Sequence, residues 1–134
     1  MLKDIKQPKL EGVALAISRE KDELNKDVFF AYLINLQDKE LENVLIRSNG
    51  YGENDGEKIQ TTELRRFYDD VPAKSHLKIE PILEEALSLS NQYWVSFYVD
   101  KTLYDRKFVF VEGSVSEANF VQLPLIGEEG VLIK

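Results

Sequence analysis

Residues 93–111 constrain the fold more than any other part of this chain. Two runs dense in aromatic and β-branched residues lie on either side of the polar pair Asp100 and Lys101. Such runs, joined by a short polar connection, predict a β-hairpin at the centre of the core. Because the pair lacks the glycine that two-residue turns prefer, a two-residue turn and a three-residue loop including Thr102 both remain open.

The length of the chain predicts a single domain. Its 134 residues can bury one sizeable core, and the hydrophobic and charged fractions of 43% and 31% are typical of globular proteins. We expect this domain to span residues 1–134. It would begin with a loose lead-in at 1–11 and include a flexible link at 112–119 and a C-terminal hairpin or tail at 120–134.

Charge and cysteine content exclude several classes of partner. The chain has 17 basic and 24 acidic residues, so its formal net charge is −7. This charge repels phosphate backbones and anionic lipids, so we expect neither a nucleic-acid partner nor membrane binding. The absence of cysteine excludes disulfides and thiolate chemistry. With no apolar run long enough for a signal peptide or a membrane span, we expect a cytoplasmic protein.

Short apolar runs between polar turns predict further strands. The run 28–36 is apolar at both its odd and its even positions, so we expect this strand to be covered on both faces. In the run 59–68, strict alternation would place Leu64 and Phe67 on opposite faces, so we expect a bulge near Arg65 and Arg66 that returns both to the core. The other expected strands are 13–17, 41–46 and 77–79, with a smaller hairpin at 120–134.

Residues 81–89 break the strand pattern. Pro81 at a first helical position, Glu84 and Glu85 in a first turn, and an apolar face at helical spacing predict one helix of about two turns. Seven or more short strands with one such helix are typical of an all-β antiparallel sandwich.

Two stretches carry a family resemblance. Residues 32–46 contain a strand, an asparagine, a polar turn and then Leu-Glu-Asn-Val, and residues 71–79 begin with Val-Pro-Ala-Lys-Ser. Both resemble bacterial immunoglobulin-like domains. The resemblance implies an immunoglobulin-like β-sandwich that acts as an adhesive, spacer or partner-docking module. It implies no catalytic residue.

Residues 49–57 predict a mobile loop without a tightly bound metal ion. They contain three glycines, two asparagines and three acids. We weighed a calcium site, because carboxylate and amide oxygens are its ligands, but the order of these residues differs from that of an EF-hand. A phosphate-binding loop is excluded because Glu53 and Asp55 would repel the phosphate.

Five residues are candidate contacts for a ligand or partner. Arg65 and Arg66 lie mid-strand, where a guanidinium can grip a carboxylate or phosphate; the alternative is an ion pair with Asp69, Asp105 or a glutamate on a neighbouring strand. Trp94, Tyr98 and Tyr104 could form an exposed aromatic surface. A tryptophan on a central strand more often belongs to the core, which is where we expect Trp94.

The sequence offers no catalytic constellation. The single histidine, His76, has no motif around it, and the paired acids lie at turns. We therefore expect a non-catalytic protein-interaction or scaffold module with no cofactor. The alternatives are a carbohydrate- or small-ligand-binding sandwich and, more remotely, an enzyme that uses carboxylates alone.

Self-association is a further expectation. Three strands carry large apolar residues on both faces, but a two-sheet sandwich buries only one face of each sheet. We expect a two-fold homodimer that uses an outer face or the tail, which could pack on its own chain or on its neighbour.

Overall fold

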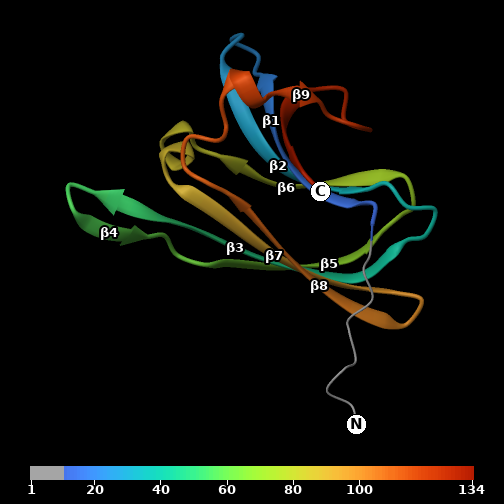
Figure 1. Cartoon of the computed structure of the whole chain (residues 1–134). Coiled ribbons are helices and arrows are strands. Elements are labelled where there is room, and N and C mark those ends of the chain that lie inside the picture. The colour runs from blue at the N-terminus through green and yellow to red at the C-terminus, as the bar shows by residue number, and fades with distance from the viewer. Residues whose placement is uncertain (1–10) are drawn as a thin grey trace.

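A computed structural model, which describes residues 11–134, shows an all-β sandwich (Figure 1). Its ten strands form two antiparallel five-stranded sheets. The strand order is β6-β2-β1-β10-β9 in the first sheet and β4-β3-β7-β8 in the second, where β5 also pairs with β3. The expected antiparallel sandwich of seven or more strands is confirmed.

The strands of the first sheet are β1 (Val13–Lys21), β2 (Asp27–Asn35), β6 (Ser75–Ile82), β9 (Val121–Gln122) and β10 (Glu129–Ile133). Those of the second sheet are β3 (Leu41–Asn54), β4 (Glu57–Gln60), β5 (Leu64–Val71), β7 (Ser90–Val99) and β8 (Thr102–Phe110). The described residues also contain two short 3₁₀ helices, η1 (Glu84–Ser88) and η2 (Glu117–Asn119).

The predicted central hairpin is formed by β7 and β8. Val99 pairs with Thr102, so the connection is the two-residue turn. Asp100 and Lys101 both have a positive φ, 49° and 66°, as a type I′ turn requires. The side chain of Asp100 forms an ion pair with Lys39, which ties this turn to the neighbouring turn between β2 and β3.

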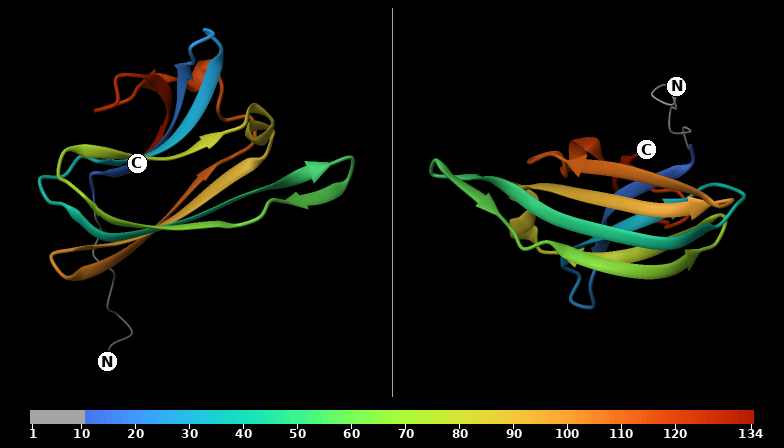
Figure 2. Two further views of the ribbon diagram at one scale, coloured as in Figure 1. Left: turned by 180° about the vertical axis from the view of Figure 1, so that it is seen from behind. Right: turned by 90° about the horizontal axis from the view of Figure 1, so that it is seen from below.

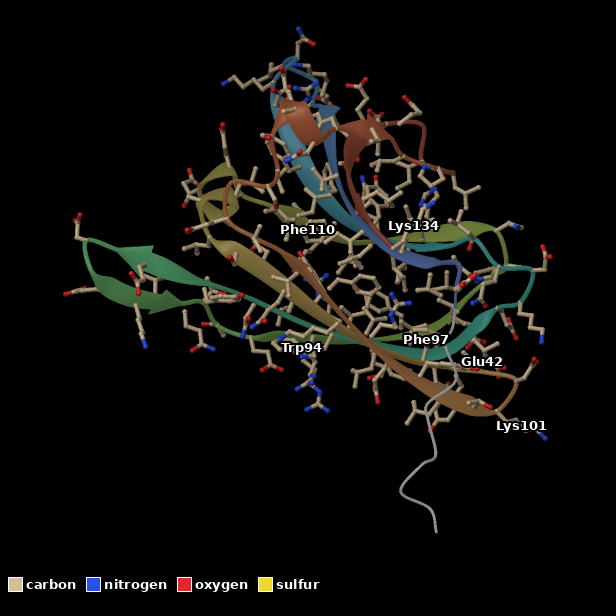
Figure 3. The ribbon with its side chains drawn as sticks, viewed as in Figure 1. Glu42, Trp94, Phe97, Lys101, Phe110 and Lys134 are labelled. Carbon is tan, nitrogen blue, oxygen red and sulfur yellow. The ribbon has the colours of Figure 1, made fainter. Side chains whose placement is uncertain are left out.

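The main core lies between the two sheets, and the central hairpin supplies its largest side chains. Tyr93, Phe97, Phe108 and Phe110 are fully buried. Figure 3 shows Phe97 and Phe110 on the side of the hairpin that faces the first sheet. The first sheet contributes aliphatic residues opposite them: Val13, Leu15, Ile17, Ala31, Leu33, Ile79 and Ile82.

The C-terminal tail covers the outer face of the first sheet. Strand β10 pairs with β1, and the tail residues Leu123, Ile126 and Leu132 belong to a second cluster that includes Tyr32 and Ile34. As a result all residues from 31 to 35 in β2 are buried, which confirms that this strand is covered on both faces. The tail therefore packs on its own chain.

The prediction of a loop at residues 49–57 is wrong. Most of the segment belongs to strands β3 and β4, which form a hairpin that projects beyond the sandwich (Figure 1). Its turn is Asp55-Gly56, with φ values of 52° and 81°, and Asp-Gly is a common two-residue hairpin turn. Gly52 is needed for close packing and not for a turn, because a Cβ there would lie 2.8 Å from Cδ2 of Leu89.

The predicted bulge near Arg65 and Arg66 is also wrong. Strand β5 pairs with β3 in continuous register from Leu64 to Tyr68, so side chains alternate between the two faces through Arg65, Arg66 and Phe67. Phe67 consequently points away from the core and is 62% exposed. The run expected at 59–68 is divided between β4 and β5, because residues 61–63 belong to neither strand.

The predicted helix is present in part. Pro81 and Ile82 still belong to β6, where they pair with Phe30 and Phe29, and the helix is a five-residue 3₁₀ segment that begins at Glu84. The proline is tolerated because β6 is an edge strand. Residues 112–119, predicted as a link, form successive turns that end in η2.

Candidate docking face of the second sheet

The second sheet has an outer face that we call the open face, formed by the outward side chains of β5, β3, β7 and β8. Figure 2 looks directly onto it in the right-hand view, where no element of residues 11–134 crosses these strands. Large apolar side chains are exposed here: Phe67 at 62%, Leu103 at 47% and Tyr98 at 38%. Leu45 and Val109 lie half-buried among them. The open face therefore exposes large apolar side chains, and within residues 11–134 it lacks the cover that the tail gives the first sheet.

Four residues from four strands form a single cross-strand row on the open face, which we call the cation row. Pairing places Arg65 of β5 opposite Arg47 of β3, Arg47 opposite Trp94 of β7, and Trp94 opposite Lys107 of β8. The Arg47 guanidinium carbon lies 5.2 Å from the Trp94 ring centroid, and Nζ of Lys107 lies 5.4 Å from it. Trp94 is thus held between two cations.

The expectation that Trp94 belongs to the core is wrong. Its side chain is half-buried and leaves β7 on the side away from the first sheet (Figure 3). Tyr98 lies on the same face, two pairs further along the strand. Tyr104 does not join them, because it stacks on Phe97 with ring centroids 5.8 Å apart and an interplanar angle of 18°. Of the predicted aromatic surface, only Trp94 and Tyr98 come together.

The side chains of Arg65 and Arg66 lie on opposite faces of β5. Arg66 points inward, and its Nη1 donates to the carbonyl of Ile79 on β6 at 3.0 Å. Arg65 lies on the open face and forms no ion pair or hydrogen bond within residues 11–134. Among the described residues, neither arginine forms the alternative ion pair with Asp69, Asp105 or a glutamate. Arg47, opposite Arg65, has an ion pair with Glu63 at 3.7 Å.

Two like charges in direct opposition are an unusual choice for a sheet, because such pairs destabilise it. Arg47 and Arg65 are opposed in this way on the open face. Within residues 11–134, Arg47 has an ion pair with Glu63 and a contact with the Trp94 ring, whereas Arg65 has no ion pair.

The row next to the cation row has a different character, and we call it the mixed row. It runs from Phe67 through Leu45 and Ser96 to Asp105. Oγ of Ser96 donates a hydrogen bond to the carboxylate of Asp105. The open face therefore carries cations in one row and an apolar end and an acid in the next.

Sequence reasoning missed Arg47, Phe67 and Lys107 as members of this site. The alternation of β3 and β8 could have placed Arg47 and Lys107 on an outer face. Their position beside Trp94 depends on the pairing of β3 with β7, between residues 47 positions apart. No local pattern in the sequence encodes that pairing.

A pocket of about 230 Å³ opens between the sheets beside η1. The hydroxyl of Tyr93 donates to Glu80 at 2.8 Å, and Oγ of Ser48 lies 3.4 Å from the same oxygen. Burial, together with the charge of Glu80, raises the pKa of Tyr93 well above its ordinary value. Because these polar groups satisfy one another, the pocket is adequately explained as a hydrogen-bonded end of the core.

Comparisons with known proteins found no matching protein-family model and no matching curated protein. Within residues 11–134, no helix is long and apolar enough to cross a membrane. The same residues contain no group of three acidic or histidine side chains that could hold a metal ion. The open face is therefore the feature from which a function can be inferred.

Proposed function

We propose that this protein is a non-catalytic protein-interaction module that binds its partner through the open face. The observation that supports this most strongly is the contrast between the two sheets. The outer face of the first is covered by the chain's own tail, whereas the second exposes Phe67, Tyr98 and Leu103. An apolar surface of this kind, with charged side chains among it, is typical of a surface that meets another protein.

The residue types on the open face agree with this proposal. Tryptophan, tyrosine and arginine contribute most often to the binding energy of protein interfaces. Trp94, Tyr98, Arg47 and Arg65 bring these types together at and beside the cation row. A carbohydrate-binding surface has less support, because Tyr104 is turned inward and Arg47 and Lys107 flank the Trp94 ring.

We also propose that the sandwich is immunoglobulin-like. Its central strands follow the order β1-β2-β6 in one sheet and β5-β3-β7-β8 in the other. This order corresponds to strands A-B-E and C′-C-F-G of an immunoglobulin-type sandwich. Docking of partners is one of the roles that the resemblance implies. A cytoplasmic location stays a prediction.

Site-specific photo-crosslinking in living cells tests the proposed function. A photoreactive phenylalanine analogue at position 67 should give discrete protein adducts, because that side chain lies in the open face. The same analogue at position 24 is the matched control, since Leu24 is 76% exposed on the β1–β2 turn, away from this face. Adducts at neither position, or the same adducts at both, would contradict the proposal.

A further inference from the structure

The cation row and the mixed row lie two residues apart along every strand of the open face. Lys107 and Asp105 are the two members on β8, and Arg65 and Phe67 are those on β5. At the usual rise of a strand, the two rows are separated by about 7 Å. The open face therefore carries parallel rows of different chemistry at a short, fixed spacing.

These two rows complement each other under a two-fold rotation. If the axis lies in the plane of the open face, perpendicular to the strands and midway between the rows, it places each row against the other row of a second copy. Lys107 then meets Asp105 of the second copy, and Arg65 meets its Phe67. The first contact is an ion pair and the second a cation–π contact, and symmetry makes each of them twice.

The central positions of the rows fit the same arrangement. Trp94 meets the small Ser96 of the second copy, and the aliphatic stem of Arg47 meets its Leu45. Sheets of two copies would then pack face to face with their strands aligned, as sheets do within a sandwich. At these two positions the larger side chain of one copy meets the smaller one of the other.

Mixed charge favours a second copy over a purely acidic partner. The open face carries Arg47, Arg65 and Lys107, but also Asp105, and Glu63 lies beside it in an ion pair with Arg47. An acidic partner would meet both acids as like charges. The tail, the other candidate for a dimer contact, already pairs with β1 of its own chain.

We propose that the open face is occupied by a second copy of this chain, in a two-fold homodimer in which Lys107 of each copy pairs with Asp105 of the other. This inference rests on the proposed function and names its partner. In this dimer the two like-charged residues Arg47 and Arg65 each contact a side chain of the other copy, Leu45 and Phe67 respectively.

Charge exchange tests the dimer. Light scattering at micromolar concentration should give the wild type twice the 15.5 kDa of one chain. Lys107→Asp and Asp105→Lys each place like charges in contact across the axis, so each should weaken the dimer at least about tenfold. The double variant, with both exchanges, should restore the wild-type dissociation constant. Lys101→Asp makes the same charge change at the hairpin tip, off the open face, and should leave the mass unchanged (Figure 3).

The outcomes separate the two proposals. A wild-type mass of one chain overturns the homodimer, and a dimer unaffected by both single variants overturns its formation through the open face. Failure of the double variant to recover association overturns the pairing of Lys107 with Asp105. If the wild type is monomeric while position 67 crosslinks to another protein, the homodimer is refuted and the interaction module stands. Circular dichroism of each variant shows whether it is folded.

Discussion

Replacing Gly130 by alanine should detach the C-terminal strand and lower the free energy of unfolding by about 3 kcal/mol. A Cβ at this position would lie 2.1 Å from the carbonyl oxygen of Ile17 and 2.8 Å from Cα of Ser18. Both atoms belong to the backbone of β1, so relief requires β10 to move away. Urea denaturation measures the loss, and hydrogen exchange should show that protection is lost first in residues 121–134.

Gly127→Ala is the matched control for this prediction. Gly127 has a φ of +81°, but a Cβ there would meet nothing within 4 Å. Gly127→Ala should therefore lower the free energy of unfolding by only about 1 kcal/mol, which is the cost of placing an alanine in the left-handed region. Equal losses for the two variants would contradict the close packing of β10 against β1 and, with it, the covered outer face of the first sheet.

Alanine substitutions at two phenylalanines should distinguish a side chain of the core from a side chain on the open face. Phe97 is fully buried and stacks on Tyr104, so Phe97→Ala should lower the free energy of unfolding by about 3–5 kcal/mol. Phe67 is 62% exposed, so Phe67→Ala should change the free energy of unfolding of the monomer by about 0.5 kcal/mol or less. Both are measured by urea denaturation at the same low protein concentration, where association does not contribute.

The effect of Phe67→Ala on association tests the proposed function. If Phe67→Ala leaves the fold intact but weakens association, then Phe67 serves binding and not folding. A loss of stability for Phe67→Ala as large as that for Phe97→Ala would mean that Phe67 is buried within one chain. The open face would then not exist in the monomer.

Local patterns were sufficient for much of the fold. The aromatic and β-branched residues around Asp100 and Lys101 predict the central hairpin, and the double-sided apolar run at 28–36 predicts a strand covered on both faces. These signals succeed because each depends on neighbours within one strand or one turn. Asp55-Gly56 was an equally local turn signal that was overlooked among the other glycines and acids around it.

The predictions that failed concern which face of a strand is inward. Alternation shows that Leu64 and Phe67, or Trp94 and Val95, lie on opposite faces, but not which face another sheet will cover. That choice depends on how distant strands pack. The local pattern therefore favours an inward Trp94 and a bulge that would bring Phe67 inward, and both predictions are wrong. The cation row could not be predicted for the same reason, because it exists only once four strands are in register.

Iodide quenching of Trp94 at increasing protein concentration tests the role of the open face most directly. The chain has one tryptophan, so its fluorescence reports on this face alone. In dilute solution the anion should reach the Trp94 ring readily, because Arg47 and Lys107 attract it. We expect quenching to decrease as light scattering shows the mass to double. A mass that doubles while the quenching of Trp94 stays constant would mean that the copies meet elsewhere, and would contradict the assignment of the open face as the docking surface.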